Sequence, residues 1–120
     1  MANPNIVNVA TINGGSLGFH LTTTAATALI TATAEYIIKI NSILVANVDG
    51  TNSADVTVSF YNGSTDFHLA KTVAVPADTS LTLLGKDAPI YLEEGHSIRG
   101  GASANSDLEI LICYEILDDA

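Results

Sequence analysis

The sequence predicts an all-β protein: an antiparallel β-sandwich, jelly-roll-like, with about eight to ten short strands. Apolar and polar residues alternate along many short stretches, as they do in strands that bury one face. Turn-forming Gly, Asn, Asp and Pro recur about every eight to twelve residues, and no stretch has the spacing of an amphipathic helix. A chain of 120 residues is long enough for one domain with one core.

The N-terminal part is predicted to contain an arm and two strands. Residues 1–5 are polar and are expected to form an extended arm that becomes ordered against a partner. Ile6–Ile12 and Leu17–Thr23 alternate as strands do, and Asn13–Gly15 between them is typical of a turn. The sandwich domain is expected to span residues 6–117, followed by a short acidic tail.

Two segments in the first half predict further extended structure. Ala25–Ala34 contains alanines that suit a helical turn, but its threonines favour a strand. Tyr36–Val48 is the longest predicted element, and period two assigns its even-numbered residues to the core. At about 3.3 Å per residue it is longer than a usual strand, so we expect a bend or bulge near Asn41–Ser42, or two successive strands. Its odd-numbered face is mixed and is a candidate interface, with the residues Lys39, Ile43 and Val45.

The second half predicts strands over Asp55–Asn62, Phe67–Val75, Thr79–Gly85 and Leu108–Leu117. Ala88–Gly101 predicts a hairpin, in which Ile90–Leu92 and Ile98 pair across a turn at Glu93–Gly95. The two glutamates of this turn would project to opposite faces. We therefore interpret them as a solvated tip and not as a catalytic pair.

Charge and composition exclude several classes of function. Thirteen acidic residues against four basic ones give a net charge of −9, and such a chain repels nucleic acid. The longest apolar run is interrupted by polar residues and is too short to span a membrane. No signal peptide is visible, which predicts synthesis in the cytoplasm. Cys113 is the single cysteine, so no intrachain disulfide forms, and we expect a small buried or semi-buried hydrophobic residue and not a nucleophile.

The sequence contains no motif of catalytic chemistry. The three histidines lie on different predicted strands and have no acidic ligand at a suitable spacing. Asp49, Asn52 and Asp55 place oxygen atoms in one region, but without the spacing of an EF-hand, and all three are ordinary turn residues. We expect a protein that is not an enzyme and that has no metal, no cofactor and no small-molecule substrate.

Several predicted strand and turn segments resemble those of a known group of proteins. They are Val73–Ala77, Leu81–Asp87, Ile90–Gly95, Ser97–Arg99, Ala102–Ala104 and Tyr114–Ile116, with Ile40–Ile43 and Val48–Asn52 upstream. Together they resemble small virion proteins of tailed bacteriophages, over most of the chain from Ile37 to Ile116. The resemblance implies a capsid decoration (cement) protein, made in the host cytoplasm and located in the virion. Its implied partners are the major capsid protein and further copies of the chain, with a homotrimer favoured.

Two surfaces are expected to make these contacts. The extended arm could add a strand to the sheet of a neighbour, through Asn3, Pro4, Asn5, Ile6 and Val7. The second surface is the mixed face of Tyr36–Val48, since a low-charge surface of Thr, Ser and Ala suits broad neutral contacts. The resemblance brings no catalytic residue with it.

Two alternatives remain at the level of sequence. A head–tail connector or tail component would have the same β framework but would form a ring. A carbohydrate- or receptor-binding module would use loop-tip residues, for which Tyr61, Asn62 and Phe67 are the candidates. The chain has no Trp and 6% aromatic residues, which weakens the case for stacking on a sugar.

Overall fold

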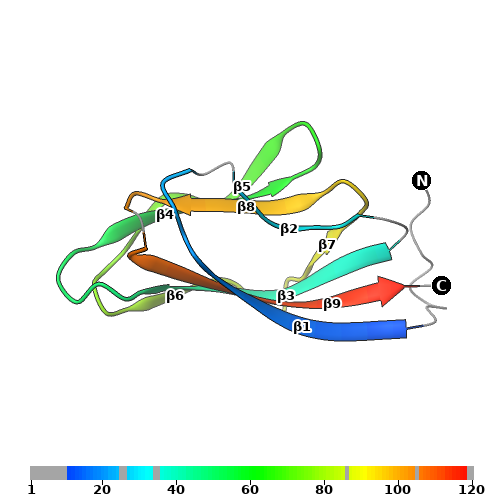
Figure 1. The fold of residues 1–120 in the computed structure, drawn as a ribbon, viewed down its shortest axis with the longest axis horizontal. Coiled ribbons are helices and arrows are strands. Elements are labelled where there is room, and N and C mark those ends of the chain that lie inside the picture. Colours follow the sequence, from blue (N-terminus) through cyan, green and yellow to red (C-terminus); the bar gives the residue numbers. More distant parts are fainter. Residues whose placement is uncertain (1–10, 25–26, 34–35, 86, 105, 119–120) are drawn as a thin grey trace.

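The computed structural model describes residues 11–24, 27–33, 36–85, 87–104 and 106–118. These residues contain no helix and form nine strands (Figure 1): β1 (Thr11–His20), β2 (Ala28–Thr31), β3 (Tyr36–Asn47), β4 (Ala54–Tyr61), β5 (Asp66–Val75), β6 (Ser80–Leu84), β7 (Ile90–Leu92), β8 (Ser97–Ala102) and β9 (Leu108–Asp118). The all-β prediction is confirmed. The predicted arm and the last two residues of the predicted tail lie outside the described residues.

The strands form two antiparallel sheets that pack as a β-sandwich. Sheet A has the order β1-β9-β3-β6, with β7 also paired to β3, and sheet B has the order β2-β8-β4-β5. In Figure 1 sheet B is the upper layer and sheet A the lower one. The pairs β1:β9, β2:β8, β3:β6 with β7, and β4:β5 nest like one long hairpin whose tip is the β4–β5 turn. Rolling this hairpin places β9 beside β3 and β8 beside β4, which is the jelly-roll arrangement.

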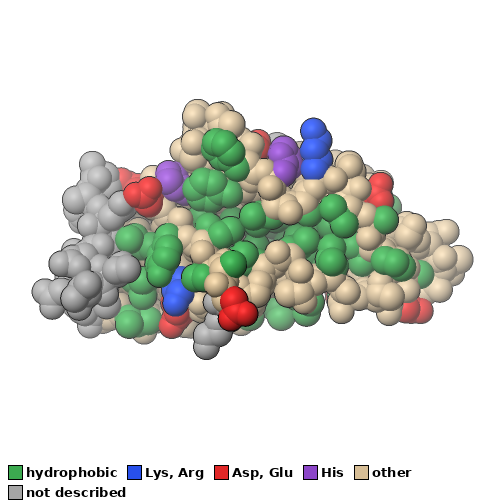
Figure 2. All heavy atoms as spheres, turned by 180° about the vertical axis from the view of Figure 1, so that it is seen from behind, with side chains coloured by type: hydrophobic (Ala, Val, Ile, Leu, Met, Phe, Trp, Pro, Cys, Tyr) green, Lys and Arg blue, Asp and Glu red, His purple; other side chains and the backbone are tan. Residues whose placement is uncertain are grey.

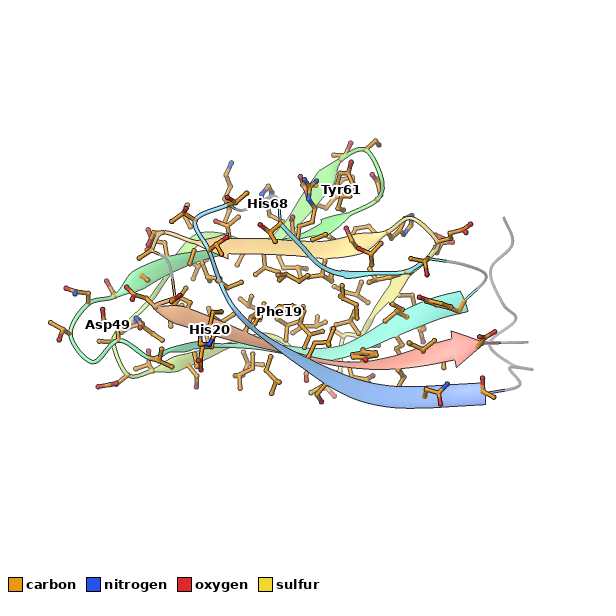
Figure 3. The ribbon with its side chains drawn as sticks, in the orientation of Figure 1. Phe19, His20, Asp49, Tyr61 and His68 are labelled. Atoms are coloured by element: carbon orange, nitrogen blue, oxygen red, sulfur yellow. The ribbon has the colours of Figure 1, made fainter. Side chains whose placement is uncertain are left out.

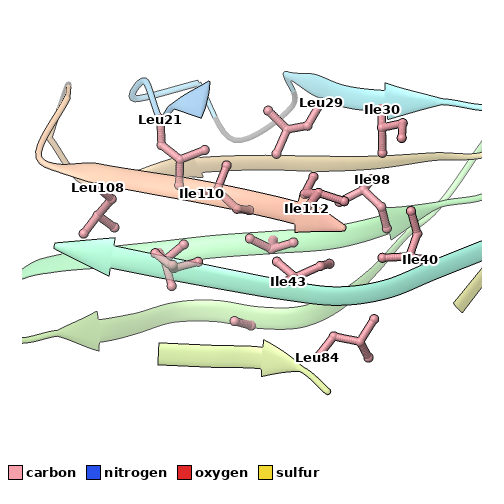
Figure 4. Packing of buried hydrophobic residues seen from close by; sticks show 14 of the residues in the cluster. Leu21, Leu29, Ile30, Ile40, Ile43, Leu84, Ile98, Leu108, Ile110 and Ile112 are labelled. Atoms are coloured by element: carbon pink, nitrogen blue, oxygen red, sulfur yellow. The ribbon is translucent and has the colours of Figure 1, made fainter. Parts of the chain in front are cut away.

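Apolar side chains from both sheets fill the space between the layers (Figure 4). Ile43, Ile110 and Ile112 of sheet A and Val58 and Ile98 of sheet B are each at most 1% exposed. Burying one such side chain contributes about 1.5–3 kcal/mol, so this layer dominates the stability of the fold. Seen from behind, apolar side chains also gather along the middle of the molecule, among mostly uncharged surface (Figure 2).

Strand β3 changes the side that faces the core at Asn41. Its register with β9 shifts between Ile40 and Ser42, so that Asn41 is an extra residue in the ladder. The predicted bulge is confirmed. Its consequence for the faces is different from the prediction, because after the bulge the odd-numbered residues point inward. Ile43 and Val45 are 0% exposed and belong to the core, so their assignment to an interface is wrong.

Strand β1 runs unbroken through the segment predicted as a turn. Asn13–Gly15 pairs with β9 in one continuous antiparallel register from Thr11 to His20. The described part of the chain therefore has one strand where the sequence predicted a strand, a turn and a second strand; residues 6–10 lie outside that part. The physical reason is a close approach. A Cβ atom on Gly15 would lie 2.6 Å from Oη of Tyr114, so the glycine makes room for a ring and does not turn the chain.

The predicted hairpin of residues 88–101 is also corrected. The turn is present, since His96 N–H donates to the carbonyl of Glu93 at 2.9 Å and Gly95 has a φ of 86°. Its two strands do not pair with each other, because β7 bonds to β3 in sheet A while β8 bonds to β2 and β4 in sheet B. The segment is therefore a crossing between the two layers.

Asn47 fastens the two sheets together at one end of the sandwich. Its side chain is 3% exposed and donates Nδ2–H to the carbonyl of Val75 at 2.8 Å and to that of Asn52 at 3.0 Å. Its Oδ1 accepts from the N–H of Asp49 at 2.9 Å. Since Asn47 ends β3 and Val75 ends β5, the amide joins sheet A to sheet B.

Candidate functional site

The outward side of sheet A, which we call the outer A face, is the candidate interaction surface. Alternation along β1, β9 and β3 gives it Ile12, Gly14, Ser16, Gly18, His20, Glu109, Leu111, Cys113, Glu115, Lys39, Ser42, Leu44 and Ala46, together with the buried Ile37 and Leu117. Leu44 and Leu111 lie directly opposite each other and are 36% and 41% exposed, and Ile12 is 57% exposed. Scattered exposed apolar residues are ordinary, but paired leucines on one sheet face form a continuous patch.

A shallow groove of about 400 Å³ crosses the outer A face. It is lined by Gly18 and His20 of β1, Leu44 and Ala46 of β3, and Glu109 and Leu111 of β9, with Phe19 and Ile110 completing it. Phe19 and His20, at the end of β1, are marked in Figure 3. The missing side chain of Gly18 opens the groove beside the leucine pair, so the floor is apolar and the rim is polar.

Charges on the outer A face occur in pairs. His20 Nδ1 lies 3.3 Å from Glu109 Oε2, an ion pair when the imidazole is protonated. Lys39 Nζ lies 3.9 Å from Glu115 Oε1, which also accepts from Asn41 Nδ2 at 3.2 Å. Such exposed pairs add about 0–1 kcal/mol to stability. The Lys39–Glu115 pair is neutral, and the His20–Glu109 pair is neutral when the imidazole is protonated, so the face carries little of the net charge of −9.

Cys113 lies near the centre of this face and not in the core. The thiol is partly exposed, and Ser16 Oγ donates to its Sγ at 3.5 Å. Hydrogen bonds from Ser16 and then from Ser42 lower the pKa of the Cys113 thiol, because both hydroxyls stabilise the thiolate. The partial burial agrees with the predicted semi-buried residue, while the two hydroxyls make the surroundings of the thiol more polar than those of a hydrophobic residue.

On the outward side of sheet B, Tyr61 takes part in a polar cluster. The guanidinium carbon of Arg99 lies 4.0 Å from the centre of the Tyr61 ring, a cation–π contact. Arg99 also pairs with Asp66 at 3.2 Å, and Asp66 accepts from Ser59 Oγ at 2.9 Å. The Tyr61 hydroxyl donates to the carbonyl of Gly63 at 3.0 Å. Both the ring and the hydroxyl therefore have partners within the domain.

The other two loop-tip candidates differ from each other. Asn62 Oδ1 accepts from the N–H groups of Ser64 and Thr65 at 3.0 and 2.8 Å, which makes Asn62 the residue that closes the β4–β5 turn. Phe67 is 55% exposed, with its ring 6.5 Å from that of Phe60. Of the three candidates, Phe67 is the one that offers an exposed apolar surface.

The loop after β3 is organised by Asp49. Its Oδ1 accepts from the N–H of Thr51 at 2.8 Å and from that of Asn52 at 3.4 Å, and these bonds lower the pKa of the Asp49 carboxyl. The carboxylate is thus used to close its own turn. Asp55 lies at the start of β4, where its N–H donates to Ser103 Oγ at 2.9 Å.

The histidines occupy separate places. His20 is on β1, His68 on β5, and His96 is in the turn before β8, where its Nδ1 accepts from the N–H of Glu93 at 3.4 Å. Within the described residues, no three His, Cys, Asp or Glu side chains come together in a way that could hold a metal ion.

The structure separates the residues predicted as an interface. Lys39 lies on the outer A face, Ile43 and Val45 lie in the core, and the five arm residues 3–7 lie outside the described residues. Leu44 was missed, because alternation without the bulge assigns it to the core. Leu111 was open to prediction, since it is one of two large apolar residues, with Leu117, on the outward register of the last strand.

A comparison with models of known protein families gives no match, and a search among curated proteins gives none either. Across the described ranges, no helix has the length and apolar character needed to cross a membrane.

Proposed function

We propose that this chain is a non-enzymatic structural protein of a bacteriophage virion, a decoration protein that binds the assembled capsid through the outer A face. The observation that carries the proposal is an apolar, weakly charged sheet face on a strongly acidic chain. The resemblance of the strand and turn segments to those of small virion proteins supports the same role. The jelly-roll sandwich supplies the flat, stiff scaffold that such a contact requires.

The face has the composition of an interface centre. Leu44 and Leu111 form its apolar middle, and the pairs His20–Glu109 and Lys39–Glu115 form a polar rim. Glu115 has a charged partner in Lys39, and Glu109 has one when His20 is protonated, so docking in that state leaves no lone charge buried. The proposed role requires a stiff β domain that can associate with its neighbours. It does not depend on whether the chain forms a dimer or a trimer.

The role is tested by locating the chain. Particles are purified on density gradients from cultures of the organism that carries the gene, and electron cryo-microscopy maps are searched for the sandwich on the outer capsid surface. The chain is expected in the particle fraction, bound to the head. A position at the neck or in the tail would favour a connector instead, and its absence from particles would exclude a virion role.

A matched pair of variants tests the face. Leu111→Asp is expected to weaken binding to the particles by about tenfold or more, because a central apolar residue contributes more than about 1.4 kcal/mol. Phe67→Asp makes the same kind of change on sheet B and is expected to leave binding unchanged. Circular dichroism of both variants confirms that the fold is intact. The reverse ranking would place the contact at the β4–β5 hairpin.

A further inference from the structure

Strand β1 forms one edge of sheet A, and among the described residues no strand pairs with its outer side. Within the part of the chain that the structure describes, β1 bonds to β9 along one side, and it is the outermost strand of sheet A. The register covers all ten residues from Thr11 to His20 without a bulge. In Figure 1 the strand runs along the near side of the lower layer. A long, regular edge strand is a template for pairing with another strand.

The ladder determines which backbone groups point away from β9. Leu21 N–H donates to the carbonyl of Leu108 at 2.9 Å, and Val48 N–H donates to that of Asp107 at 2.9 Å. Even-numbered residues of β9 therefore bond toward β1, and odd-numbered ones bond toward β3. Because bonded and non-bonded pairs alternate in an antiparallel ladder, the even-numbered residues of β1 direct N–H and C=O outward. They are Ile12, Gly14, Ser16, Gly18 and His20.

The remaining sheet edges are protected, and β1 is not. β2 has four residues and a register shift, β6 has five and a register shift, and β7 has three and follows Pro89. β5 is long, but its ladder is interrupted by two register shifts, Thr72 has a φ of 49°, and Lys71 lies on it. Short length, bulges, Pro and Lys are the usual means of preventing strand addition. β1 has none of them.

We propose that β1 pairs antiparallel with β1 of a second copy of this chain, about a twofold axis at Ser16, so that the two A sheets become one continuous sheet. In this register Ser16 lies opposite Ser16 of the second copy, Gly14 opposite Gly18, and Ile12 opposite His20. The five outward residues of each copy then exchange about ten backbone hydrogen bonds. An isologous pairing of this kind closes at two copies.

The distribution of charge favours a second copy of the chain as the partner of the β1 edge. A chain with a net charge of −9 repels its own copies unless the surfaces that meet are free of acids. Thr11–His20 contains no Asp and no Glu, and His20 is its one ionisable side chain. In the proposed register no like charges lie opposite each other, and small residues face small residues.

The pairing does not rest on the proposed virion role. It concerns the free edge of sheet A, whereas capsid binding concerns the outer A face, and the two are measured separately. A twofold contact yields a dimer, in place of the homotrimer implied by the resemblance.

Sedimentation equilibrium of the full-length chain tests the pairing. The wild-type chain is expected to sediment as a dimer in equilibrium with monomer. Ser16→Lys and Ser16→Glu each place like charges opposite each other at the axis and are expected to raise the dissociation constant about fivefold or more. An equimolar mixture of the two variants is expected to restore the dimer, because Lys then faces Glu. Restoration requires that residue 16 of one copy lies opposite residue 16 of the other. Failure of the two variants to associate with each other therefore overturns the register.

Two controls separate the edge from the face. Ser80→Lys makes the same substitution at an exposed position of β6, the opposite edge of sheet A, and is expected to keep the wild-type mass. Leu111→Asp, at the middle of the outer A face, is also expected to keep it. Loss of the dimer in Leu111→Asp would indicate face-to-face packing and overturn the proposal. A wild-type chain that is monomeric at high concentration, or trimeric, would overturn it as well.

Discussion

Gly15 is the residue at which β1 admits the ring of Tyr114. An added Cβ would lie 2.6 Å from Oη and 2.7 Å from Cζ of that ring, distances that real Cβ atoms do not show. A Cβ atom added to the neighbouring Gly14 would point the other way and lie 3.9 Å from its nearest neighbour, the carbonyl oxygen of Tyr114. Two consecutive glycines therefore have unequal importance.

We predict that Gly15→Ala lowers the free energy of unfolding by about 1–3 kcal/mol, because the Tyr114 ring must move from its place. Gly14→Ala is expected to change it by less than about 0.5 kcal/mol. Urea denaturation measures both. In the double variant Gly15→Ala, Tyr114→Leu, most of the loss is expected to disappear; additive effects would mean that the ring is not the obstacle.

Cys113 gives a pH-dependent prediction. Since hydrogen bonds from Ser16 and Ser42 lower the pKa of its thiol, the thiolate appears at a lower pH in the folded chain than in the unfolded one. The rate of alkylation by iodoacetamide is expected to rise at a lower pH in the folded protein than in urea. Ser16→Ala removes the larger cause and is expected to shift this profile toward higher pH. A profile that Ser16→Ala leaves unmoved would contradict the assignment.

The sign for stability follows from the same shift. A folded pKa below the unfolded one means that the unfolded chain holds the proton more tightly. The contribution of Cys113 to stability is therefore present above the unfolded pKa, and it is lost as the pH falls through the folded pKa.

At the scale of elements, the bulge at Asn41 changes which residues of β3 face the core. Even-numbered residues point inward before the bulge, and odd-numbered residues point inward after it. Ile40 pairs with Tyr114 and Ser42 pairs with Cys113, so Asn41 has no opposite residue of its own. Removing Asn41 would leave a regular ladder with the same pairs and the same inward residues. Removing a residue after the bulge would move the side chains that follow it in β3 to the opposite face of the sheet.

We predict that deletion of Asn41 preserves the fold and costs about 1–2 kcal/mol, from its bond to Glu115 and the lost twist. Deletion of Leu44 is expected to cost about 3–6 kcal/mol, because Val45 and Asn47 would be turned out of the core. Urea denaturation followed by circular dichroism compares the two. Equal losses would show that β3 is not held by its pairing with β9.

At the scale of the whole molecule, the sandwich keeps a net charge of −9 in a body of 49 × 26 × 20 Å. Among the described residues, Lys39–Glu115 and Arg99–Asp66 are ion pairs, and His20–Glu109 becomes one when the imidazole is protonated. Repulsion among the excess acids therefore outweighs attraction in the folded state.

We predict that sodium chloride stabilises the chain by about 1 kcal/mol between about 0.01 M and 1 M, because screening removes this repulsion. The midpoint of urea denaturation measures the effect at fixed protein concentration. Lys71→Gln makes the chain more acidic and is expected to steepen the salt dependence. A midpoint that falls with salt would mean that the ion pairs contribute more than the repulsion costs.

The sequence by itself determined the class of fold and the positions of most strands. Apolar and polar residues alternate in segments such as Val56–Phe60, and this pattern is stable as a strand with one face buried and one face outward. The local pattern is therefore enough to predict the strand. The bulge in β3 was also predictable, because the predicted element was longer than a usual strand.

Only the tertiary structure decided the paths and faces that depend on a distant partner. Asn13–Gly15 has turn composition and yet continues β1, because β9 and the Tyr114 ring lie beside it. Leu44 and Val45 exchanged sides, since one extra residue in a ladder inverts every position that follows it. Local sequence determines whether a segment is extended. The choice of neighbour, and with it the face that remains free for function, depends on contacts between residues far apart in the chain.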